Sequence, residues 1–200
     1  MDSSKMTRVA KNLDTLANVG GKIAAACAVV CVLVAAMTLV FGGKMFAADI
    51  VTLDLDFIKF HLTDAATVNE TCLKLYAVAV TLGGGIICAL IWYVAKLLRD
   101  ILSPMKLGRP FEAGVSEGLR KIGWAILAGG LFSEVMGVVS RVLLAKAYSF
   151  HELFATAAIA ETEFVFTMDM NFVLTACVIF LLSYIFKYGQ ALQQDSDETL

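Results

Sequence analysis

Four long apolar stretches constrain the fold of this chain more than any other feature. A helix needs about 20 mostly apolar residues to cross the hydrocarbon core of a bilayer. Apolar residues make up 59% of the 200 residues and charged residues 17%, whereas a soluble domain averages about 45–50% and about 25%. We therefore predict an all-α membrane protein with four transmembrane helices. The predicted spans are residues 23–41, 76–94, 122–144 and 170–187.

Three segments outside the spans have patterns that predict their structure. In residues 3–20, Met6, Val9, Leu13 and Leu16 recur every three or four positions. This spacing predicts an amphipathic helix lying on the membrane surface, although a simple charged leader fits the same residues. Residues 95–121 form a basic loop in which Pro104 and Gly108 are expected to interrupt helical structure, and Pro110 is placed to begin a helix that runs into the third span. Residues 190–200 form a polar tail.

The distribution of basic residues predicts the orientation of the chain. With Lys187, the last residue of the fourth span, included, eleven Lys and Arg residues fall on the side that holds both termini and residues 95–121, and four fall on the other side. Loops rich in Lys and Arg remain in the cytoplasm. We therefore expect cytoplasmic termini, a cytoplasmic 95–121 loop and extracellular loops between spans one and two and between spans three and four.

Both predicted extracellular loops contain alternating patterns. Apolar and polar residues alternate over 51–57, and large apolar residues recur at every second position over 164–172. A period of two is typical of a half-buried strand. The two loops could thus pair as a small two-stranded extracellular β element; alternatively, residues 164–172 begin the fourth helix.

The third span contains the charged residues that the other spans lack. Gly130, Glu134, Gly137 and Arg141 are spaced by four, three and four, which places them on one helix face, and Ser133 and Ser140 flank it. An ionisable side chain inside a bilayer is costly, so it should face the protein interior or a wet cavity. Glu134 is therefore a candidate site for an ion, a proton or a cationic ligand. The alternative is a structural hydrogen bond to another helix.

Two other motifs have both a structural and a functional interpretation. The triple glycine at 83–85 either unwinds the second span and exposes carbonyl groups or lets helices approach closely. On the cytoplasmic side, basic and turn residues either contact anionic lipid or dock a protein. The residues of this candidate docking segment are Arg109, Pro110, Phe111, Arg120 and Lys121.

No catalytic motif is present in the sequence. It contains no phosphate-binding loop, hydrolase triad or metalloprotease helix, and its five cysteines form no CxxC pair. Cys27 and Cys31 share a helix face, where packing in a membrane helix is their expected role. We expect no enzymatic activity, no cofactor, no metal site and no direct binding of nucleic acid.

Short motifs near the middle and the end of the chain resemble a known family. They are GRPF at 108–111, LRKIG at 119–123 and IFKYG at 185–189, followed by Leu192-Gln193 and DETL at 197–200. In these motifs, and in the four-span layout, the chain resembles the bacterial membrane-protein family called domain of unknown function 2975. It departs at Val115 or Ser116, where an asparagine would be expected. The resemblance implies the bacterial cytoplasmic membrane and a small helix-turn-helix regulator as partner, and it implies no catalytic residue.

Three hypotheses about function follow. The first is a non-enzymatic sensory or regulatory membrane protein that acts with a cytoplasmic partner. The second is a component of a small transporter or channel that uses Glu134; four spans are few for transport, so it would be a homo-oligomer. The third is a structural or immunity-type membrane protein that tolerates changes at both candidate sites.

Overall fold

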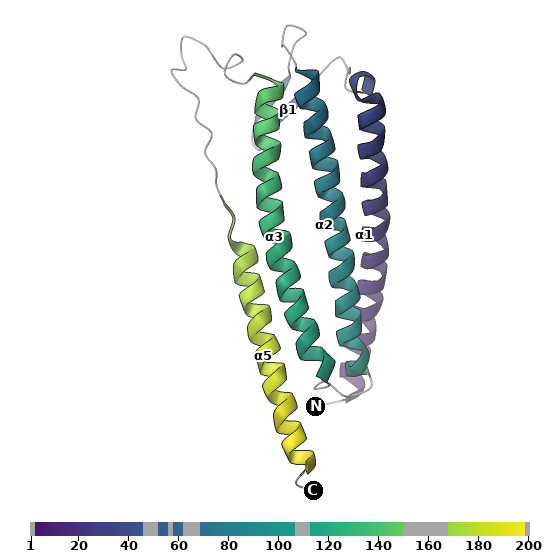
Figure 1. The fold of residues 1–200 in the computed structure, drawn as a ribbon. Helices are drawn as coiled ribbons and strands as arrows, with labels where there is room; N and C mark the ends of the chain where they lie inside the picture. Colours follow the sequence, from purple (N-terminus) through teal and green to yellow (C-terminus); the bar gives the residue numbers. More distant parts are fainter. Residues whose placement is uncertain are drawn as a thin grey trace. The chain divides into compact units, whose positions relative to one another are not determined.

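The computed structural model describes residues 3–45, 52–55, 58–61, 69–106, 113–149 and 168–198. Most of them belong to four helices, shown in Figure 1: α1 (Ser3–Met45), α2 (Glu70–Lys106), α3 (Ala113–Ala147) and α5 (Asn171–Glu198). Each of the four is long and apolar enough to cross a membrane. Many large apolar side chains on them are exposed, among them Val40 and Leu174. Because such surfaces are stable against lipid rather than water, the chain is a multi-pass membrane protein, and the four predicted spans are confirmed.

The helices extend well beyond the predicted spans. At a rise of 1.5 Å per residue, the 37 residues of α2 are about 55 Å long, against roughly 30 Å of hydrocarbon. The predicted helix break at Pro104 is therefore wrong, because α2 continues through Pro104 to Lys106. Helix α3 begins at Ala113, close to the predicted helix start at Pro110, and runs into the third span. A proline this close to a helix end removes only one of the last hydrogen bonds, so the helix tolerates it. Most of the predicted 190–200 tail is also helical, because α5 ends at Glu198.

Glycines do not interrupt the helices where the sequence suggested breaks. Residues 3–20, predicted as a separate surface helix, are continuous with the first span in α1. A Cβ on Gly21 would lie 3.2 Å from the Ala95 Cβ, and one on Gly83 would lie 3.0 Å from the Met136 Cε. The triple glycine at 83–85 likewise lies inside an unbroken α2. Unwinding at 83–85 is therefore excluded, and close helix approach is the observed role of Gly21 and Gly83.

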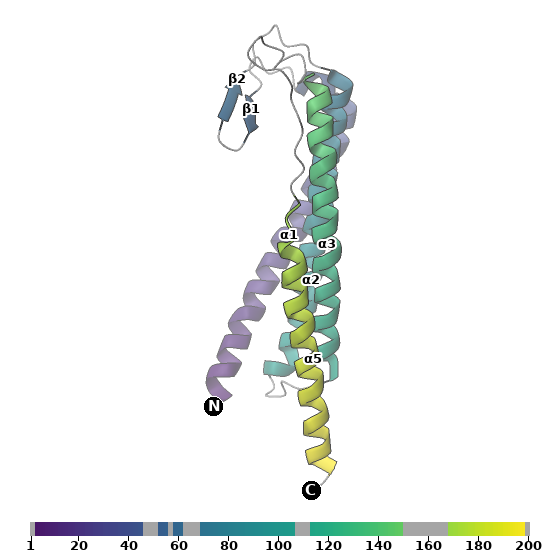
Figure 2. The ribbon, with the colours of Figure 1, turned by 90° about the vertical axis from the view of Figure 1, so that its left-hand side faces the viewer.

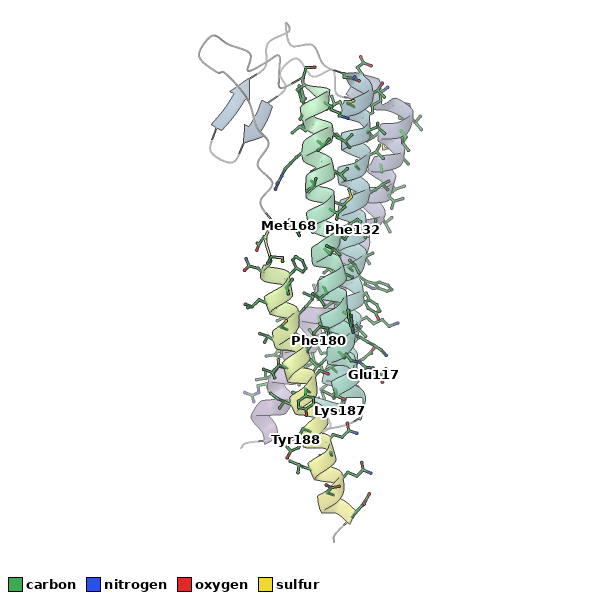
Figure 3. The ribbon with its side chains drawn as sticks, turned by 60° about the vertical axis from the view of Figure 1, so that its left-hand side comes forward. Glu117, Phe132, Met168, Phe180, Lys187 and Tyr188 are labelled. Atoms are coloured by element: carbon green, nitrogen blue, oxygen red, sulfur yellow. The ribbon has the colours of Figure 1, made fainter. Side chains whose placement is uncertain are left out.

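The chain divides into two compact units, and the helices α1, α2 and α3 contribute to both. The first unit contains residues 1–29, 85–133 and 169–200. Its core is a cluster of the buried side chains Ile101, Val115 and Ile122. Figures 1 and 3 show α5 alongside α3 in this unit, and the Ser183 hydroxyl donates a 2.7 Å hydrogen bond to the Ser116 carbonyl.

Glycines of α3 lie against large side chains in the first unit. A Cβ on Gly118 would lie 2.7 Å from the Ile101 Cγ1. Larger overlaps would occur against α5, where a Cβ on Gly123 would lie 2.6 Å from the Phe180 ring and one on Gly130 would lie 2.2 Å from the Phe172 ring. The Phe180 ring also meets Trp124 edge to face, with centroids 5.5 Å apart. Because these positions have no Cβ, the aromatic rings of α5 can pack directly on the α3 backbone.

The second unit contains residues 30–84 and 134–168. In it Asn69 joins the start of α2 to the end of α3: its side chain accepts a hydrogen bond from the Cys72 N–H at 3.2 Å, and its own N–H donates to the Ala147 carbonyl at 2.8 Å. Ser149, with φ of 45°, ends the turn that follows α3. Beside it, burial raises the pKa of the Tyr148 phenol, and the nearby Tyr76 contributes further.

A hairpin follows α1 in the sequence. Strand β1 (Thr52–Leu55) pairs antiparallel with β2 (Ile58–His61), and Leu53 lies opposite Phe60. Figure 2 shows the two strands side by side. The partner of β1 is thus the adjacent segment rather than residues 164–172. Of that second segment, residues 164–167 lie outside the described residues, 168–170 form no strand, and Asn171 and Phe172 begin α5. The predicted strand pairing between two loops is therefore wrong for β1, because a short connection closes the local hairpin at a lower entropic cost.

Candidate functional site

The polar face predicted on the third span lies on α3. In the second unit, Glu134 is half-buried and Arg141 is exposed. Among the described residues, neither side chain makes a hydrogen bond or an ion pair. The Ser140 hydroxyl donates to the Gly137 carbonyl of its own helix at 2.9 Å, and Ser133, in the first unit, is exposed. All four residues of the predicted face lie in α3, and the hydrogen bond from Glu134 to another helix, one of the two alternatives, does not form within the described residues.

The predicted docking segment is described only in part. Arg109, Pro110 and Phe111 lie outside the described residues. Arg120 and Lys121 are exposed on the first turns of α3. The Lys121 Nζ lies 2.9 Å from the Glu117 Oε1, an ion pair between residues four positions apart in one helix.

An ion-pair cluster that the sequence analysis missed connects α1 to α2 in the first unit. The Asp14 carboxylate lies 2.6 Å from the Lys106 Nζ and 3.3 Å from the Arg99 Nε. Because Asp14 accepts from two cations, it offsets part of the positive charge at this end of α2. No local signal could have revealed this cluster, since Asp14 is 85 positions away from Arg99 in the sequence.

Two hollows open on the first unit, one on each side of α3. The α2–α3 hollow encloses about 460 Å³ beside the residues Leu97, Asp100, Ser103, Pro104 and Lys121. The α3–α5 hollow encloses about 530 Å³ and is lined by Ser116, Glu117, Arg120, Phe180, Tyr184 and Lys187. Figure 3 labels Glu117 on α3 and Phe180 and Lys187 on α5. The α3–α5 hollow therefore combines two cations with aromatic side chains.

Comparison with known proteins identifies the family and no activity. A family described as a protein of unknown function (DUF2975) matches residues 61–200. The chain belongs to the DUF2975 family. The match to DUF2975 includes α2, α3, α5 and both hollows, and it begins after α1. Neither a curated protein nor a solved structure matches the chain.

The described part of this DUF2975 chain contains no cluster of three or more His, Cys, Asp or Glu side chains that could hold a metal ion. The first unit has exposed charges, open hollows and exposed apolar side chains.

Proposed function

We propose that this protein is a non-enzymatic sensory or regulatory protein of the bacterial cytoplasmic membrane that acts with a soluble cytoplasmic partner. In this proposal both termini are cytoplasmic, in agreement with the excess of Lys and Arg on their side. The β1–β2 hairpin and the segment after α3 are then extracellular. They would meet the signal, and the helix ends of the first unit would meet the partner.

One observation carries this proposal: an exposed apolar stripe continues beyond the last span. Tyr184, Tyr188 and Leu192 recur every fourth residue on α5 and are 70%, 62% and 53% exposed. Tyr188 (Figure 3) and Leu192 lie past the predicted span, where polar Gln193, Gln194 and Asp195 follow. Exposed tyrosine and leucine at i and i+4 on a helix in water are typical anchors for a protein partner. The family resemblance suggests a small helix-turn-helix regulator as that partner.

We expect the solubilised protein to retain a small helix-turn-helix protein from the cytoplasm of its host. Tyr188→Glu/Leu192→Glu should lower the retained amount by about tenfold or more, because two apolar anchors are lost and two charges are added. Quantitative mass spectrometry of the pulled-down proteins measures this effect.

The matched control is Gln193→Glu/Gln194→Glu, which adds the same charge to exposed residues of the same turns. It should retain the regulator as the wild type does. Equal retention by all three proteins, or loss in both double variants, would contradict docking on the Tyr188–Leu192 stripe.

A second candidate function, a small oligomeric transporter or channel component, rests on Glu134. This residue is half-buried within a span and has no ion-pair or hydrogen-bond partner among the described residues. If it carries ions or protons, Glu134→Gln should reduce flux into proteoliposomes by tenfold or more. Val135→Gln, an exposed neighbour, is the control for adding an amide, and equal flux through wild type and Glu134→Gln would remove this candidate.

A further inference from the structure

The two cations of the α3–α5 hollow lie on antiparallel helices. Side chains on a helix lean toward its N-terminus. Arg120 therefore leans toward Ser116 on α3, and Lys187 leans toward Ser183 on α5. The hydrogen bond from the Ser183 hydroxyl to the Ser116 carbonyl shows that Ser183 on α5 lies beside Ser116 on α3. Both cations line the hollow, so its positive charge comes from two helices.

The acidic side chain of the hollow offsets only part of their positive charge. Glu117 also lines the hollow, but its carboxylate is paired with Lys121 at 2.9 Å. The remaining polar groups are neutral, and the Tyr184 hydroxyl and the Gln190 amide can donate hydrogen bonds. The side chains that line the hollow therefore have a net positive charge and additional hydrogen-bond donors. Both properties favour the binding of an anion.

An apolar wall borders the hollow on the side toward the middle of the spans. Phe180 lines it, and the Trp124 ring packs against Phe180 while remaining 62% exposed. Trp124 belongs to the predicted span 122–144, whereas Arg120 precedes it. Tryptophan is enriched where hydrocarbon meets headgroups. The ligand should accordingly have a negative head beside Arg120 and Lys187 and an apolar tail beside Trp124.

We propose that the α3–α5 hollow binds an anionic phospholipid, with its phosphate between Arg120 and Lys187. The Arg120 guanidinium can hold two phosphate oxygens at once, and Lys187 supplies a point charge. The acyl chains lie against Trp124 and Phe180. This inference depends on membrane insertion and not on the proposed cytoplasmic partner.

The test uses Trp124 as its own probe. Trp92→Phe leaves Trp124 as the sole tryptophan, since the chain has two. In phosphatidylcholine vesicles that contain brominated phosphatidylglycerol, quenching of Trp124 fluorescence reports the local lipid. We expect quenching well above that given by an equal fraction of brominated phosphatidylcholine. Arg120→Gln/Lys187→Gln should lower the relative affinity for phosphatidylglycerol by about 25-fold, at about fivefold for each charge.

Lys22→Gln/Lys96→Gln removes two exposed cations from the same side of the chain and should retain the preference. Arg120→Lys/Lys187→Arg keeps both charges; it should fold as the wild type does and should also retain the preference. Undiminished preference in Arg120→Gln/Lys187→Gln would overturn the proposal, as would an equal loss in Lys22→Gln/Lys96→Gln. Inorganic phosphate at millimolar concentration should not relieve the quenching; if it does so completely, the hollow takes free phosphate and not lipid.

Discussion

Gly130→Ala should destabilise the packing of α5 on α3 by about 1–3 kcal/mol or more. The new Cβ would lie 2.2 Å from Cγ and 2.5 Å from Cβ of Phe172. Because contacts with these inner atoms cannot be relieved by a small ring rotation, α5 itself has to move. Denaturant unfolding of the detergent-solubilised protein, followed by circular dichroism, measures the change in the free energy of unfolding.

Two variants separate this clash from a general effect of removing glycine. Gly137→Ala lies on the same face of α3, where a Cβ meets no described atom within 4 Å. It should be neutral or stabilising, because alanine favours a helix over glycine by up to about 1 kcal/mol. Phe172→Ala in the Gly130→Ala background should cost less than the two single changes together, by about 1 kcal/mol. Additive losses would show that Gly130 and Phe172 do not pack as described.

Ile101→Ala should lower the free energy of unfolding by about 2–5 kcal/mol. Ile101 is 4% exposed, belongs to the core cluster with Val115 and Ile122, and lies over Gly118 of α3. Truncation of the Ile101 side chain removes these contacts and leaves a cavity, because Gly118 has no side chain that could fill it. The same unfolding measurement in detergent detects it.

Ile91→Ala is the matched control, because Ile91 lies on the same helix and is 52% exposed. In a membrane protein an exposed isoleucine faces lipid or detergent, so its truncation leaves no cavity and should cost under 1 kcal/mol. Similar losses for Ile91→Ala and Ile101→Ala would contradict the assignment of the core cluster to this face of α2.

Hydropathy alone predicted the four helices, because the cost of unpaired backbone groups in lipid leaves an apolar segment no other structure. Helix ends were less predictable. Gly20-Gly21 and the triple glycine permit either a break or a close approach, and only the facing residues Ala95 and Met136 decide between them. The partner of β1 was mistaken because alternation reveals a strand but not its pairing.

The candidate sites were predictable to different degrees. Glu134 and Arg141 share the predicted face, because that requires only the period of one helix. The α3–α5 hollow was not predicted, although Arg120 was already a candidate residue. Lys187 and Tyr184 line the same hollow as Arg120 because of the register in which α5 packs on α3. This register depends on pairs of residues that are far apart in the sequence.

The glycine–phenylalanine contacts between α3 and α5 restrict how this pair of helices can move. Gly123 contacts Phe180, and Gly130 contacts Phe172. The two glycines are seven residues apart on α3, and the two phenylalanines are eight residues apart on α5. Sliding α5 by one turn would move both rings onto positions that carry a Cβ, and it would break the Ser183–Ser116 hydrogen bond. The two ring contacts and this hydrogen bond therefore fix the register of α5 on α3, so that a relative movement of the two helices by one turn costs all three at once.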